Sequence, residues 1–158
     1  MNNTIVKNTG LYGGGLFLRN SSPILINNIV AFNSSGIYRS SSLSLPVFRN
    51  NCVYGNIVYD YNGVTDPTGM DGNISADPVF VSTEYGDFHI QPGSACIDAG
   101  SNSDVQTELD IDGQQRIQPN EGTVDIGADE CDGTSRTYMP EVIIYVSLEG
   151  SNANDGSS

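Results

Sequence analysis

The chain has 158 residues and a mass of 16.8 kDa, which is the size of a single domain. Six Lys and Arg against nineteen Asp and Glu give a net charge of −13 and a pI near 4.1, so neither nucleic acid nor an anionic membrane surface is expected as a partner. Gly, Asn and Ser are abundant, and Val, Ile, Tyr and Phe occur in short runs. This mixture favours many short strands joined by tight turns.

Three segments near the N-terminus align without gaps. NNTIVKN, NNIVAFN and NNCVYGN occupy residues 2–8, 27–33 and 50–56. The spacing predicts a repeat of about 23 residues with three short strands in each unit. A unit of that length cannot close a core on itself, so the repeats are expected to stack as coils of parallel strands.

Stacking places equivalent apolar residues in columns. The expected columns are Ile5 with Val30 and Val53, Leu16 with Ile37, and Ile24 with Val47. The repeated asparagines are expected at a sharp bend, because Asn tolerates the left-handed conformation and its amide can bond to the same amide one coil away. An antiparallel sandwich with accidental Asn-Asn pairs is the alternative.

The repeat fails after Tyr61, and short apolar patches then alternate with turns and acids. We predict coils over residues 1–61 and a loop excursion followed by irregular strands that close the end of the stack over 62–130. A linker at 131–141 then leads to a terminal strand and polar tail at 142–158.

Four later segments resemble a known group: ADPVF at 76–80, GDFHIQPGSACIDAG at 86–100, DIDGQQR at 110–116 and VDIGADE at 124–130. The repeats resemble right-handed parallel β-helices of the pectate-lyase-like superfamily, and residues 73–130 resemble the C-terminal part of the choice-of-anchor Q family of bacterial surface proteins. The resemblance implies an all-β, right-handed parallel β-helix of few coils, with an irregular C-terminal end and a detached terminal strand. It also implies an extracellular or cell-surface location.

A calcium site is the one metal site considered from the sequence, because Asp110 and Asp112 offer oxygen ligands in the segment DIDG. A turn in which Asp side chains accept from backbone amides explains the same residues without a metal. No other cofactor is expected. His89, the sole histidine, is interpreted as structural, and the three cysteines as buried thiols, with a Cys96–Cys131 bridge as the alternative.

No catalytic residue is predicted. A polysaccharide lyase would need a base such as Lys7, Arg19, Arg39 or Arg49, but these side chains are more typical of solvated partners of Asp. Several aromatic residues are candidates for stacking on sugars: Tyr12, Phe17, Tyr38, Phe48, Tyr54, Tyr59 and Tyr61. A fragment of a secreted polysaccharide lyase or polysaccharide-binding protein is therefore the alternative function.

The preferred function is a non-catalytic structural module that assembles head to tail. The first coil begins without a cap, and an open strand edge recruits partners. The expected partner is the terminal strand of a second copy, formed by Val142, Ile143, Ile144, Tyr145, Val146 and Ser147. A contact of this type gives a homo-oligomer or a filament. No apolar run is long enough to insert into a membrane.

Overall fold

The computed structural model describes residues 1–117 and 122–138, and this part of the chain is all-β apart from the 3₁₀ turn η1 (Asn102–Asp104). The strands are short: β1 (Thr4–Val6), β2 (Leu16–Leu18), β3 (Ile24–Ile26), β4 (Ile29–Ala31), β5 (Ile37–Arg39), β6 (Val47–Arg49), β7 (Cys52–Tyr54), β8 (Tyr61–Asn62), β9 (Phe80–Ser82) and β10 (Asp87–Ile90). None of the helical segments in these residues has the length and apolarity that a bilayer crossing requires.

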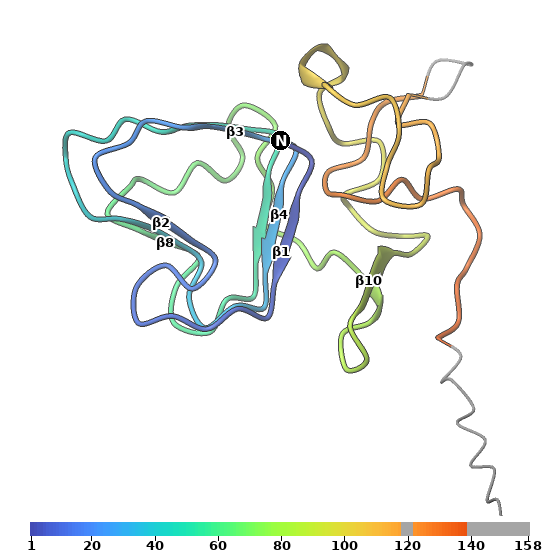
Figure 1. The fold of residues 1–158 in the computed structure, drawn as a ribbon, viewed down its shortest axis with the longest axis horizontal. Coiled ribbons are helices and arrows are strands. Elements are labelled where there is room, and N and C mark those ends of the chain that lie inside the picture. Colours follow the sequence, from blue (N-terminus) through green and yellow to red (C-terminus); the bar gives the residue numbers. More distant parts are fainter. Residues whose placement is uncertain (118–121, 139–158) are drawn as a thin grey trace, which may run out of the picture.

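Successive repeats lie on one another as parallel rungs (Figure 1). The sheets β1-β4-β7, β2-β5-β8 and β3-β6 are each parallel, and they form three sides of the repeat region. The prediction of stacked parallel strands is confirmed, and the antiparallel sandwich is wrong for the repeats. We call residues 2–76 the stack.

The pairing register matches the predicted columns residue by residue. Ile5 pairs with Val30 and Val30 with Val53, and the Leu16–Ile37 and Ile24–Val47 pairs are also present. The first column points into the stack, where Val30 and Val53 are buried beside Leu18, Ile37 and Phe48. The Ile24–Val47 column differs from expectation because both side chains are exposed on the outer face, and their neighbours Leu25 and Phe48 fill the interior.

The asparagine pairs divide two tasks between them. The first Asn of each pair has a left-handed backbone, with φ of 51° at Asn2, 55° at Asn27 and 48° at Asn50. The second Asn forms the ladder Asn3–Asn28–Asn51–Asn73, in which each side-chain amide donates to the Oδ1 of the next, at 2.9–3.0 Å. The predicted ladder is confirmed. The first Asn of each pair makes the left-handed bend, and the second forms the ladder.

A second ladder runs from Asn8 through Asn33 to Asn56, and Asp60 ends it. The stack also ends in partial pairings, because β8 pairs with β5 and Ile74 forms a parallel bridge with Cys52. The third rung, β7 and β8, thus has no third strand among the described residues, and a fourth rung only begins at Ile74.

Residues 77–117 and 122–138, which we call the side region, lie beside the stack against the sheet β1-β4-β7 (Figure 1). Ile29, Ala31 and Cys52 project from this sheet into a second apolar cluster with Ile90 and Ile126. The sequence predicts these residues at the end of the stack. They lie against its side instead because this sheet is apolar on both faces, as parallel sheets covered on both faces are.

Candidate functional site

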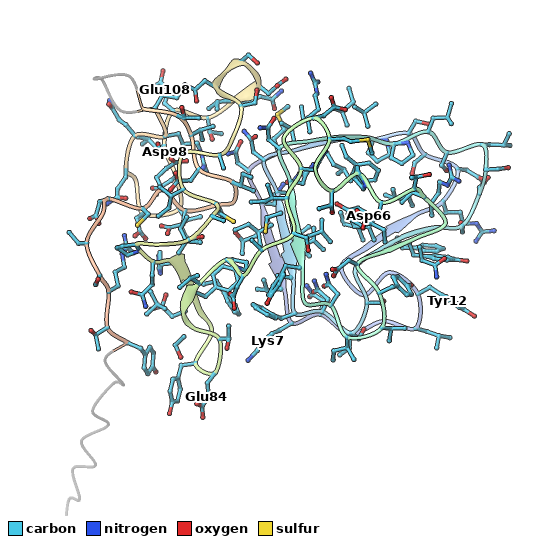
Figure 2. The ribbon with its side chains drawn as sticks, turned by 180° about the vertical axis from the view of Figure 1, so that it is seen from behind. Lys7, Tyr12, Asp66, Glu84, Asp98 and Glu108 are labelled. Carbon is cyan, nitrogen blue, oxygen red and sulfur yellow. The ribbon has the colours of Figure 1, made fainter. Side chains whose placement is uncertain are left out.

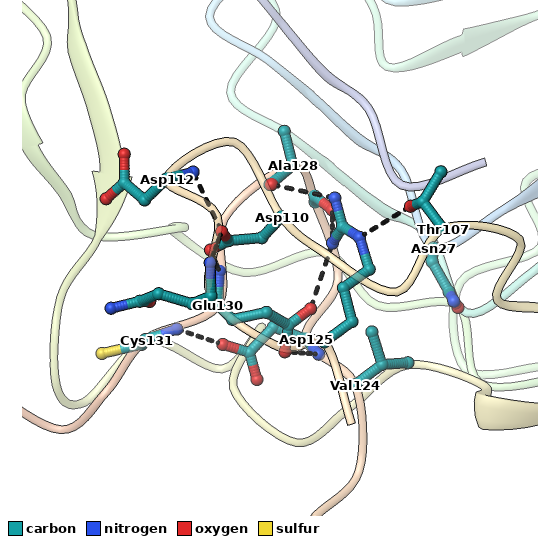
Figure 3. Close-up of polar contacts among 12 residues, drawn as sticks. Asn27, Thr107, Asp110, Asp112, Val124, Asp125, Ala128, Glu130 and Cys131 are labelled. Atoms are coloured by element: carbon teal, nitrogen blue, oxygen red, sulfur yellow. Dashed lines mark hydrogen bonds and ion pairs between the residues drawn. The ribbon is translucent and has the colours of Figure 1, made fainter. Parts of the chain in front are cut away.

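The two acidic motifs at 110–116 and 124–130 come together in the side region and pack beside β10 (Figure 3). Few of their residues belong to regular strands, so side chains replace backbone ladders as partners for the backbone N–H groups. The two motifs therefore form the densest group of buried charges in the described residues.

An ion pair lies at the centre of this group. Arg116 and Glu130 are buried, and Arg116 Nη1 lies 3.1 Å from Glu130 Oε1. Arg116 also donates to the carbonyl oxygens of Gly127 and Ala128 and to Thr107 Oγ1. Glu130 accepts a second bond, from the backbone N–H of Asp125. Four of the five guanidinium N–H groups and both carboxylate oxygens thus have a partner, which helps a buried ion pair to be tolerated.

Asp125 joins two loops by accepting from the backbone N–H groups of Asp98 and Cys131, at 2.8 and 2.7 Å. Burial raises the pKa of Asp125 to about 6, although these two hydrogen bonds act in the opposite direction. The carboxyl is a structural connection and faces no cavity that the structure describes.

The two residues considered for calcium lie in one turn but have different surroundings. Asp110 Oδ1 accepts from the N–H groups of Asp112 and Gln114, and its Oδ2 accepts from Glu130 N–H at 3.0 Å. This is the metal-free turn that explains the sequence DIDG without calcium. Asp112 points elsewhere, toward Arg136 at 2.7 Å and His89 at 3.2 Å. Calcium binding by Asp110 and Asp112 stays a prediction.

His89 is the residue whose surroundings the sequence did not indicate. Its Nδ1 lies 2.6 Å from Asp87 Oδ1 and its Nε2 lies 3.2 Å from Asp112 Oδ1. Burial lowers the pKa of His89, but the hydrogen bonds with Asp87 and Asp112 outweigh burial and raise it. Asp129 completes the group: His89, Asp112 and Asp129 each offer an atom within 4.8 Å of the other two. The signal in the sequence is the spacing Asp87-x-His89, which places both side chains on one side of a strand.

The basic side chains of the stack do not converge. In the pairing of β2 with β5, Arg39 lies opposite Leu18, so Arg19 is one residue away from the position opposite Arg39. Arg49 lies 3.7 Å from Asp104, and Lys7 donates to the carbonyl of Thr83, at the junction between stack and side region (Figure 2). Arg39 donates to the Ser44 carbonyl, so Lys7, Arg39 and Arg49 each make a separate local contact.

The aromatic candidates fall into two groups. Phe48, Tyr54 and Tyr61 pack against the apolar clusters. The others form an outward-facing row on the sheet β2-β5-β8, with ring centroids 5.4 Å apart for Tyr12–Tyr38, 5.6 Å for Phe17–Tyr38 and 6.4 Å for Tyr38–Tyr59. Tyr12 lies on the side of the stack remote from the side region (Figure 2).

All three cysteines are free, and Cys96 has Cys52 rather than Cys131 as its side-chain hydrogen-bond partner. The predicted assembly strand, residues 142–147, lies outside the described residues.

Fold and site together define an all-β protein of stacked parallel rungs, with a lateral loop region built on buried charges. Comparison of the chain with protein-family models, with curated proteins and with solved structures gave no match.

Proposed function

We propose that the protein is a non-catalytic structural module of an extracellular or cell-surface protein, and that it assembles head to tail with further copies of itself. In this proposal the stack is a right-handed parallel β-helix of the pectate-lyase-like type, and the side region is of the choice-of-anchor Q type. The parallel sheets and the quoted motifs support this assignment.

The observation that carries the proposal is the direction of the asparagine ladders. The Oδ1 atom of Asn28 accepts from the N–H and the amide of Asn3, and the Oδ1 atom of Asn51 accepts likewise from Asn28. Within the described residues, nothing donates to the Oδ1 atoms of Asn3 and Asn8. No described strand pairs with the outer edge of β1 or β2. The first rung therefore presents free Oδ1 atoms, which in the inner rungs accept hydrogen bonds from the preceding rung.

The proposed occupant is the segment 142–147 of a second copy. Its sequence, VIIYVS, has the β-branched and aromatic composition of a strand. Charge favours the same contact, because sixteen of the nineteen acidic residues follow residue 76, whereas four of the six basic residues lie in the stack. Lys7 and Arg19 belong to the first rung, and Glu141 and Glu149 flank the proposed strand.

The test is the mass of the particle in solution, measured by light scattering coupled to gel filtration over a range of concentrations. We expect the intact chain to form oligomers whose size grows with concentration. Deletion of residues 140–158, and the substitution Ile144→Asp, should each give a monomer. The matched control Asn154→Asp adds the same charge to the polar tail and should leave the oligomers unchanged. A monomeric intact chain, or unchanged oligomers after the deletion, would overturn head-to-tail assembly.

A second candidate, polysaccharide binding, is favoured by the outward aromatic row. Tyr12 and Phe17 are exposed on the row, and flat rings of this kind stack on sugar faces. Affinity electrophoresis in gels containing polygalacturonate or alginate tests it. The candidate requires that the polymer retard the native chain and that Tyr12→Ala lose the retardation, with exposed Tyr85→Ala as control. An ultraviolet-absorbing unsaturated product would point to a lyase instead.

A further inference from the structure

Three side chains from separate parts of the side region converge beside β10. His89 lies in the strand, Asp112 in the turn of the first acidic motif and Asp129 in the second motif. One imidazole nitrogen or carboxylate oxygen from each lies within 4.8 Å of the others, close enough for small side-chain shifts to bring all three onto one metal ion. This arrangement is independent of the assembly proposed above.

Asp129 carries the first observation that points to a ligand. The residue is 2% exposed, and its Oδ2 accepts from the backbone N–H of Ile90 at 2.9 Å. Its Oδ1 is buried and has no hydrogen-bond partner among the described residues. An unpaired buried carboxylate oxygen is unfavourable and rare in folded proteins, so a ligand is expected to pair with it. An ionised carboxylate oxygen has no proton to donate, so its partner must be a hydrogen-bond donor or a cation.

His89 carries the second observation. The contact of Nδ1 with Asp87 Oδ1, at 2.6 Å, is the carboxylate–histidine pairing that fixes the imidazole tautomer behind a metal. Nε2 lies 3.2 Å from Asp112 Oδ1, and when protonated it donates a hydrogen bond to that oxygen. A metal ion bound between Nε2 and Asp112 Oδ1 would take the place of this proton, while Nδ1 keeps its hydrogen bond with Asp87.

We propose that His89 Nε2, Asp112 Oδ1 and Asp129 Oδ1 bind a divalent transition metal of the Zn²⁺ class. An imidazole with two carboxylates suits zinc and similar ions, whereas calcium takes oxygen ligands alone. Three protein ligands leave a fourth position for water. Asp110 is not a ligand in this site because both of its oxygens are engaged by backbone N–H groups. Arg136 contacts Asp112 through Oδ2 and leaves Oδ1 facing His89.

The test is calorimetric titration of the full chain with Zn²⁺ and with Ca²⁺, in a Cys131→Ser background that removes the partly exposed thiol. We expect one Zn²⁺ per chain. His89→Gln and Asp129→Asn should each lower the affinity by at least 100-fold. Asp112→Asn should do the same, and because Asp112 is exposed this variant should keep its fold. Asp87 contacts the imidazole but not the metal, so Asp87→Ala should lower the Zn²⁺ affinity by about 10–100-fold.

The matched control is Asp132→Asn, an exposed carboxylate nearby whose contact is with Thr134. It should bind Zn²⁺ like the parent chain. Substituting Co²⁺ gives a second readout, since its absorption spectrum should lack the thiolate charge-transfer band. The proposal is overturned by absence of Zn²⁺ binding, by preference for Ca²⁺, by full affinity in Asp112→Asn, by an equal loss in Asp132→Asn, or by a thiolate band.

Discussion

The stack and the side region both bury polar side chains, but with opposite chemistry. In the stack the buried polar groups are neutral amides, such as Asn28, Asn33 and Asn51. In the side region they are charged, with Arg116, Asp129 and Glu130 the clearest cases. An amide both donates and accepts, so it can be repeated from rung to rung, whereas a carboxylate only accepts and ends a chain of hydrogen bonds.

The stack illustrates this in its third rung, where the Asn56 amide donates to the carboxylate of Asp60 and the second ladder stops. Repeated rungs thus use side-chain amides as partners for the backbone, whereas irregular loops use carboxylates. A substitution in the stack breaks one link of a series, whereas a substitution in the side region leaves an opposite charge without its partner.

The largest effect is expected from breaking the buried ion pair. Arg116→Met removes the guanidinium and leaves Glu130 buried with only the Asp125 N–H. We expect a loss of about 3–5 kcal/mol in the free energy of unfolding, measured by urea denaturation. The double variant Arg116→Met, Glu130→Gln should regain part of this loss. If the double variant is no more stable than the single one, charge is not what distinguishes the side region.

A smaller effect is expected within the stack. Asn51→Ala removes an amide that accepts from Asn28 and donates to the Asn73 side chain and two carbonyls, so we expect a loss of about 2–4 kcal/mol. Asn3→Ala at the ladder's end is the control and should cost less than about 1 kcal/mol. Equal losses in urea denaturation would mean that position in the ladder does not matter.

The pH dependence of the free energy of unfolding sharpens the comparison, because Asp125 is a buried titrating group that can be substituted alone. The pKa of Asp125 is about 6 in the folded protein, against about 3.9 for an unperturbed Asp. The folded state therefore holds this proton more tightly, and the free energy of unfolding should fall by about 1.4 kcal/mol per pH unit as the pH rises between these values. Above pH 6 the contribution of Asp125 is constant.

Asp125→Asn removes this titration, so its stability should depend less on pH between 4 and 6 than that of the parent chain. The measurement is the melting temperature by circular dichroism at half-unit pH steps. The net charge of −13 adds a slope that both proteins share. Parallel curves would show that Asp125 is not the titrating group.

The smallest effect is expected at Tyr61. Its hydroxyl is buried and has no hydrogen-bond partner in the part of the chain that the structure describes. Tyr61→Phe removes a polar group without removing a bond, so stability should stay within about 0.5 kcal/mol or rise. A loss above 1 kcal/mol in urea denaturation would contradict the prediction and identify a hydroxyl partner.

The repeats were predictable because spacing alone fixes which residues pair in a parallel stack. The columns through Val30 and Ile37 followed directly from aligning three segments. The outward direction of Ile24 did not follow, because a three-residue strand between bends has too few positions to establish which face is buried.

The position of the side region was also not predicted, although the sequence held a signal. The strand Ile29–Ala31 is apolar at three successive positions, which is typical of a strand covered on both faces. The approach of His89 to Asp129 could not be predicted, since the two lie forty residues apart and Asp129 is on an irregular loop whose course depends on tertiary packing.

One feature of the junction bears on how such a chain changes in evolution. The side region is bonded to consecutive rungs: Thr4 Oγ1 accepts from Ala128, Asn27 donates to the Ser101 carbonyl and Asn50 to that of Ala99. Inserting or losing one repeat would displace these anchor points by about 4.8 Å, the distance between neighbouring strands. The lateral loops thus fit only one number of rungs. Gene rearrangements that add or remove a repeat would be selected against unless the loops changed length as well.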